Sequence, residues 1–150
     1  GEATTLEKLA SDPAVVRQAK AALDRGEKST LSEVEGLTVT AVIDAANHGD
    51  QLSQSLLAQA GRWLGIGIAT LINILNPQLI IIGGEGVQAG EWRLESMREA
   101  IKTYTFDSLA DDVEIVIEPS GDETWARGAA TLVLGEIFKS PVHKQEIVPR

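Results

Sequence analysis

A long apolar pattern between Asp50 and Asn76 constrains the fold of this chain more than any other feature. Its apolar residues recur at helical spacing and predict one long helix with a continuous buried face. Proline at position 77 cannot continue a helix, so the helix should end there. The residues of the predicted buried face are Leu52, Leu56, Leu57, Ala60, Leu64, Ile68, Leu71, Ile72 and Leu75.

Three glycines interrupt this predicted helix, at Gly61, Gly65 and Gly67. Each glycine costs a helix roughly 1 kcal/mol relative to alanine, so we expect another backbone to approach closely there. The longest apolar run, residues 63–75, is shorter than the roughly 20 residues that a membrane span needs. The pattern therefore predicts a buried core helix, and we expect no membrane partner.

Two strands are predicted after the helix. Residues 78–82 (QLIII) lack alternation, which is typical of a central parallel strand buried on both faces, whereas residues 113–118 (VEIVIE) alternate. Between them, residues 91–104 form an amphipathic helical pattern, and together the three segments predict a right-handed βαβ unit. The expected buried side of that helix consists of Trp92, Leu94, Met97, Ile101 and Tyr104.

Shorter helices are predicted on both sides of this unit. A short helix from Thr5 should run into a longer one that Asp12 caps and Gly26 ends. Residues 27–39 are expected to be a polar connector, and Thr40 should cap a brief helix that ends at Gly49. Residues 121–138 predict a C-terminal helix, followed by a tail at 139–150.

Two strands are few for so many helices, because a strand buried on both faces needs neighbours. We therefore expect an α/β chain that forms the C-terminal part of a longer protein, with residues 1–138 in one truncated lobe. The net charge of −9 repels phosphate backbones, so no DNA-binding surface is expected within these 150 residues. The chain has no cysteine, which excludes disulfides and thiolate zinc sites.

The run LGIGIATLINILNPQLIIIGGEG resembles the ROK family of repressors, open reading frames and sugar kinases. That family has a helix of the form LGxGxAxLxNxxNP, which leads into an apolar strand and a glycine turn. The resemblance implies an actin-like, ribonuclease H-like ATPase fold. The IGGEGV form and the final helix are most similar to NagC/XylR-type transcriptional regulators of high-GC Gram-positive bacteria.

The resemblance implies a sugar contact at Glu7. The first residues, GEATTLE, lie over the GxxGCxE part of a family motif in which cysteines help to bind zinc and the glutamate contacts sugar hydroxyls. Thr5 replaces the cysteine and cannot bind zinc as a thiolate does, so we expect no metal site. The alternative for Glu7 is a solvated first-turn acid that the helix dipole favours.

The resemblance also implies that Gly83, Gly84, Glu85 and Gly86 occupy the family's adenosine-binding motif. Glycines let backbone N–H groups approach a phosphate or ribose, but they also suit a turn that needs positive φ. Glu85 adds a negative charge where a triphosphate would lie. We therefore expect a remnant of a nucleotide motif, and no cofactor.

Other candidate residues have simpler structural explanations. Asp122 and Glu123 could be paired acids, but a helix cap explains them more simply. His48 lies at a helix end, where a surface position is expected. Trp63, Trp92 and Trp125 are expected to be core or interface residues.

The resemblance implies the effector-binding and dimerisation part of a cytoplasmic transcriptional regulator, with no catalytic residues in this chain. Its partners would be a sugar or sugar phosphate, a second copy of the protein, and DNA only through a helix-turn-helix upstream. The alternative is the C-terminal lobe of a ROK sugar kinase, in which the full-length protein phosphorylates a sugar with ATP.

Overall fold

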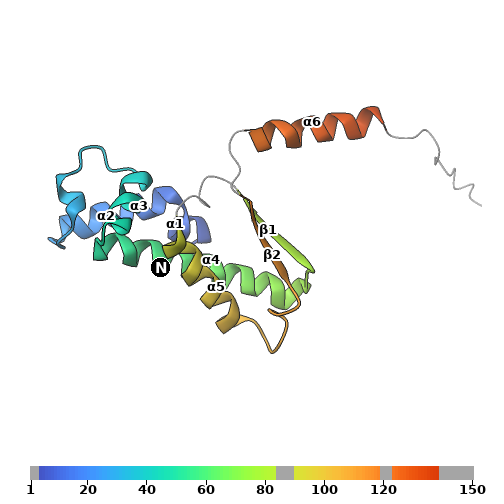
Figure 1. Cartoon of the computed structure of the whole chain (residues 1–150), viewed down its shortest axis with the longest axis horizontal. Helices are drawn as coiled ribbons and strands as arrows, with labels where there is room; N and C mark the ends of the chain where they lie inside the picture. Colours follow the sequence, from blue (N-terminus) through green and yellow to red (C-terminus); the bar gives the residue numbers. More distant parts are fainter. Residues whose placement is uncertain (1–3, 84–89, 119–122, 139–150) are drawn as a thin grey trace, which may run out of the picture. The chain divides into compact units, whose positions relative to one another are not determined.

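The computed structural model describes residues 4–83, 90–118 and 123–138 (Figure 1). The chain divides into two units, residues 1–119 and residues 120–150. The second unit contains α6, in which Leu132, Val133 and Leu134 are exposed. In chain order the elements are α1 (Leu6–Ala10), α2 (Asp12–Asp24), the 3₁₀-helix η1 (Thr30–Glu33), α3 (Val39–Asn47), α4 (Gln51–Leu75), β1 (Leu79–Gly83), α5 (Glu91–Tyr104), β2 (Glu114–Glu118) and α6 (Glu123–Ile137).

The first unit is built on α4, which packs against α1, α2, α3 and α5 (Figure 1). Asp50 caps its N-terminus by accepting a hydrogen bond from the backbone N–H of Ser53. Asn76 ends it in the left-handed conformation, with φ of 42°. The helix is long and apolar enough to cross a membrane by length and composition alone. Its packing against four other helices is that of a core helix, as the sequence predicts.

The close approach predicted for the α4 glycines is confirmed at two of the three. A Cβ on Gly61 would collide with the backbone carbonyl of Arg93, and a Cβ on Gly65 would collide with that of Met97. Gly67 instead faces the side chain of Leu6. Glycine therefore brings the backbones of α4 and α5 together along one seam.

Strands β1 and β2 pair in parallel, which confirms the predicted strand–helix–strand order. The prediction that β1 is buried on both faces is wrong in the part of the chain that the structure describes. Ile80 and Ile82 are partly buried against the helices, whereas Leu79 and Ile81 are exposed, Ile81 to 60%. The described helices of the first unit cover only one face of the two strands, so alternate side chains remain in solvent.

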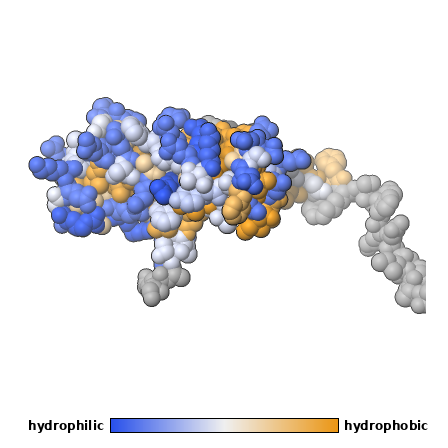
Figure 2. All heavy atoms as spheres, turned by 90° about the horizontal axis from the view of Figure 1, so that it is seen from below, coloured by the Kyte–Doolittle hydropathy of each residue, from blue (hydrophilic) through white to orange (hydrophobic). Residues whose placement is uncertain are grey.

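Two hydrophobic clusters fill the first unit. One lies among α1, α2, α3 and the first half of α4, and the other lies between the second half of α4, α5 and the strands. Leu64 packs against both clusters. Figure 2 shows mostly hydrophilic residues over the α2–α3 end and hydrophobic ones towards the end that carries the strands. Exposed apolar residues of that end include Leu71, Ile74, Leu75, Phe106 and Val116.

Several predicted helix boundaries are wrong by one or two residues. Ser11, not Asp12, caps α2, and Thr38, not Thr40, caps α3. In each case two residues close in sequence carry an oxygen that can cap, and the sequence alone does not show which one does. The polar connector at 27–39 contains η1, which buries Leu31 in the first cluster.

The predicted burial is also wrong at four positions. Leu71 and Leu75 of α4 are exposed, and in α5 Trp92 and Tyr104 are 38% and 40% exposed. The buried face of α5 passes instead through Leu94, Met97 and Ile101, as predicted, and through Arg93, which was not predicted. The rotation of α5 is set by its backbone contact with α4, which brings Arg93 inward.

Candidate functional site

Glu7, the predicted sugar contact, lies in the first turn of α1 with its side chain exposed. The side-chain oxygen of Thr5 caps this helix by accepting a hydrogen bond from the N–H of Lys8 at 3.3 Å. Leu6 packs towards α4 at Gly67. The carboxylate of Glu7 is therefore exposed to solvent, while the preceding residue, Leu6, packs against α4.

The corner between α1 and α2 is formed by Ser11. Its backbone N–H donates to the carbonyl oxygen of Glu7 at 3.2 Å, and its hydroxyl accepts from the N–H of Ala14 at 3.3 Å. From α2, Arg17 donates to the carbonyl oxygen of Lys8 at 3.3 Å and Gln18 donates to that of Leu9 at 3.1 Å. These bonds satisfy backbone carbonyls at the end of α1 and fix its angle to α2.

The residue after this corner, Asp12, forms an ion pair with Arg93 of α5. Nη1 of Arg93 lies 2.7 Å from Oδ1 of Asp12, and the two side chains are 3% and 26% exposed. A guanidinium buried to this extent requires a charged or hydrogen-bonding partner. The ion pair therefore joins the α1–α2 corner to the first turn of α5.

A pocket of about 290 Å³ lies beside this ion pair and reaches the end of β1. It brings Gly83 next to Ser11, Asp12 and Arg93, whereas Glu7 is not among its lining residues. The apolar part of the lining consists of Ala10, Leu64, Ile82, Leu94 and Met97.

Of the predicted nucleotide motif, Gly84, Glu85 and Gly86 lie outside the described residues. Gly83 is the last residue of β1 and pairs with Glu118. On the other side of the gap, Gly90 caps α5 with φ of 78°, a conformation that favours glycine. Gly83 thus ends β1 and Gly90 precedes α5, on either side of the residues that the structure does not describe.

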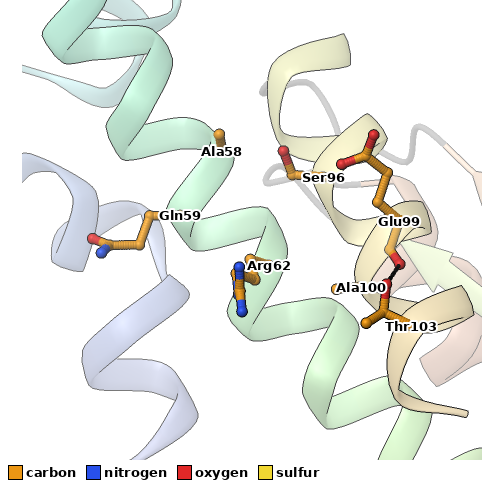
Figure 3. A pocket seen from close by; sticks show the side chains of 7 residues that line it. All are labelled: Ala58, Gln59, Arg62, Ser96, Glu99, Ala100 and Thr103. Carbon is orange, nitrogen blue, oxygen red and sulfur yellow. Dashed lines mark hydrogen bonds between the residues drawn. The ribbon is translucent and has the colours of Figure 1, made fainter.

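A second pocket, of about 380 Å³, lies along the seam between α4 and α5 (Figure 3). Arg62 and Glu99 lie on opposite helices, and the hydroxyl of Thr103 donates to the carbonyl oxygen of Glu99 at 2.8 Å. Nη2 of Arg62 donates to the hydroxyl of Tyr104 at 2.7 Å. The remaining described lining residues are Ala58, Gln59, Ser96 and Ala100.

Among the described titratable residues, Asp50 has the most clearly shifted pKa. Burial would raise its pKa, but hydrogen bonds from the backbone N–H groups of Ser53 and Thr30 outweigh burial and lower the pKa to about 2. Both N–H groups lie 2.8 Å from the carboxylate. These bonds anchor η1 to the start of α4, so Asp50 has a structural role.

The structure describes only some of the other sequence candidates. His48 is exposed at the end of α3, as expected, with Nδ1 2.7 Å from the carbonyl oxygen of Asp44. Asp122 and the side chains of Glu123 and Trp125 lie outside what the structure describes. Trp63 is partly exposed, at 37%. Within the described ranges no three His, Cys, Asp or Glu residues are grouped as metal ligands would be.

Comparison with known proteins identifies relatives of two functional kinds. The chain is 27% identical over 144 residues to a xylose repressor of Caldicellulosiruptor bescii, which covers 94% of this chain and 36% of the repressor. It is 31% identical over 137 residues to a glucokinase of Halalkalibacterium halodurans, which covers 89% of this chain and 42% of the glucokinase. The chain thus spans about two fifths or less of the length of these relatives.

A solved structure of a ROK family transcriptional regulator, described as a homologue of the E. coli MLC protein, superposes with a TM-score of 0.77. It is 33% identical, and the match covers 87% of this chain and 33% of that chain. The sequence model of the ROK family matches residues 1–136. The long α4, the parallel strands and the motifs around them are those of the actin-like ROK fold, and the chain belongs to the ROK family.

Proposed function

We propose that this chain is the sugar-sensing part of a ROK-family transcriptional regulator and that Glu7 binds sugar hydroxyls. The observation that carries the proposal is the exposed carboxylate of Glu7 on a helix that the Ser11 corner holds in place. A carboxylate accepts strong, charge-assisted hydrogen bonds from hydroxyl groups. A fixed backbone reduces the entropy that such a contact loses on binding.

The regulator relatives support this proposal. The xylose repressor matches 94% of the chain, and the regulator structure is 33% identical to it. Phosphoryl transfer needs an aspartate base and a magnesium–nucleotide site, and we assign neither role to a residue of this chain. The glucokinase relative supports the second candidate, a lobe of a sugar kinase whose catalytic residues lie elsewhere in the full-length protein.

We further propose that residues 1–138 form part of a larger lobe, that the regulator is a cytoplasmic homo-oligomer, and that DNA binds through an upstream helix-turn-helix. The exposed faces of Leu79, Ile81 and Val116 support a larger lobe, because apolar sheet faces are stable when they are covered. The net charge of −9 makes this chain itself a poor partner for DNA.

The full-length protein tests the two candidates directly. It would be titrated with D-glucose, N-acetylglucosamine and D-xylose in the presence of its own promoter DNA, and ADP production would be measured with each sugar and ATP. A regulator binds the DNA, loses affinity for it with one of the sugars and forms no ADP. Sugar-dependent ADP production without DNA binding would establish the kinase instead, and the absence of sugar binding would reject the sensor role.

A further inference from the structure

The groove between α4 and α5, of about 380 Å³, carries opposite charges on its two walls (Figure 3). Arg62 belongs to α4 and Glu99 belongs to α5. Within the described ranges the carboxylate of Glu99 has neither an ion-pair nor a hydrogen-bond partner. The groove therefore presents to solvent a cation and an anion that are not paired with each other.

The guanidinium of Arg62 is held in place by Tyr104. Its Nη2 donates to the Tyr104 hydroxyl at 2.7 Å, and its central carbon lies 5.8 Å from the centre of the Tyr104 ring. A contact with the face of the ring uses none of the guanidinium's other N–H groups. Arg62 is thus oriented in advance and retains the donors that a carboxylate would accept.

The exposed face of α5 beside the groove has the composition of a protein interface. Ser96, Glu99 and Thr103 follow Trp92 at helical spacing, so these four residues share one face of the helix. Trp92 is 38% exposed, and Tyr104, next to Arg62, is 40% exposed. Trp, Tyr and Arg are the residues in which the binding energy of protein interfaces concentrates.

The charges of the groove fit a second copy of the same chain. Because the net charge is −9, two copies repel each other unless they meet at a patch whose charges compensate. A two-fold axis along the groove places α4 of each copy over α5 of the other, and so places Arg62 of each copy opposite Glu99 of the other. Ala58 and Ala100, which line the groove, are small enough to let the second surface approach.

We propose that the α4–α5 groove is a homodimer interface in which Arg62 of each copy pairs with Glu99 of the other. Trp92 and Tyr104 pack at its rims and exclude water from the two ion pairs. The inference rests on the proposed function only for the existence of a homo-oligomer, to which it assigns a surface and a pairing. It depends on neither sugar nor DNA.

Charge reversal tests this pairing in the full-length protein, without sugar or DNA, by measuring the dimer Kd in the analytical ultracentrifuge. Arg62→Glu places two carboxylates opposite each other, and Glu99→Arg places two guanidinium groups opposite each other. In an equimolar mixture of the two variants, a heterodimer brings opposite charges together at both positions. Both side chains are exposed, so neither reversal disturbs the core.

We expect each single reversal to raise the dimer Kd by about tenfold or more, because like charges then face each other in the interface. The mixture should return to within about threefold of the wild-type Kd, since both ion pairs are restored. Glu91→Arg is the matched control. It reverses an exposed charge on the same helix, at a residue that does not line the groove, and should leave the Kd unchanged.

Three results would overturn the proposal: a monomeric wild type, single variants that dimerise as the wild type does, or a mixture that dimerises no better than either variant alone. A monomeric wild type would also remove the proposed homo-oligomer. An oligomer that the reversals leave unchanged would overturn the groove interface alone. The sugar and DNA titrations decide the sensor role separately, so failure of that role leaves this test intact.

Discussion

The backbone carbonyl of Arg93 occupies the space that a Cβ on Gly61 would need. One turn further along each helix, the carbonyl of Met97 faces Gly65 in the same way. Helices α4 and α5 therefore contact each other backbone to backbone, and Gly61 and Gly65 make this possible. The contact also fixes the turn of α5 from which Arg93 reaches Asp12.

The backbone contact between α4 and α5 predicts that alanine at Gly61 destabilises the protein more than alanine at Gly67. Gly61→Ala should destabilise the protein by about 1–3 kcal/mol, because a methyl group would push α5 away and the helix-propensity gain of about 1 kcal/mol does not compensate. Gly67→Ala is the control, since its Cβ would meet the side chain of the exposed Leu6, with Cδ2 at 3.0 Å and Cδ1 at 3.9 Å, and no backbone. Urea unfolding of the full-length protein measures both. A Gly61→Ala variant as stable as Gly67→Ala would contradict the seam.

Asn73 predicts a second local effect, at the end of α5. Its amide donates to the carbonyl oxygen of Tyr104 at 2.9 Å and accepts from the N–H of Phe106 at 2.9 Å. Asn73→Ala should cost about 1–2 kcal/mol and speed exchange of the Phe106 amide. Thr70→Ala is the control, because the Thr70 hydroxyl bonds only within α4, to Ile66. Equal exchange at Phe106 in both variants would show that Asn73 does not hold this turn.

Asp50 predicts a pH dependence of stability. Its pKa is about 2 in the folded protein against an ordinary value of 3.8, so its contribution is complete above about pH 5 and is lost as the pH falls towards 2. Asp50→Asn should cost about 1–2 kcal/mol at pH 7, and this difference should shrink between pH 5 and pH 2. Unfolding midpoints across this range measure it, with the exposed Asp24→Asn as control. If the difference in stability between Asp50→Asn and the wild type stayed constant with pH, it would not arise from ionisation of the Asp50 carboxylate.

The sequence allowed α4, α5 and the two strands to be predicted because their patterns are long and their ends carry Asn-Pro or glycine signals. The exposed positions of Trp92 and Tyr104 could not be predicted, because hydrophobicity alone does not fix how α5 is rotated. The glycines of α4 set that rotation through a contact between distant segments. Leu31 was missed for a related reason, because the connector also contains Val34, Leu37 and Val39, and the sequence does not show which of them is buried.

The site was predictable only in part. Glu7 was identified through its resemblance to a family motif, and its exposed place in the first turn of α1 suits the alternative of a solvated first-turn acid equally well. The Asp12–Arg93 pair gave no local signal, because its partners are far apart in sequence. The sequence of α5 does indicate that Arg93 is buried, because Arg93 falls at helical spacing with Met97 and Ala100 on the buried face. Which carboxylate pairs with it depends on the tertiary fold.

The central claim is that Glu7 binds the sugar. Isothermal titration calorimetry on the full-length protein, with whichever of D-glucose, N-acetylglucosamine and D-xylose binds, tests it most directly. Glu7→Gln should weaken binding by about 1–3 kcal/mol, because a neutral amide accepts a weaker hydrogen bond than a carboxylate. Glu35→Gln, at another exposed position, should leave the affinity unchanged. Equal affinities of the Glu7→Gln variant and the wild type would contradict the assignment.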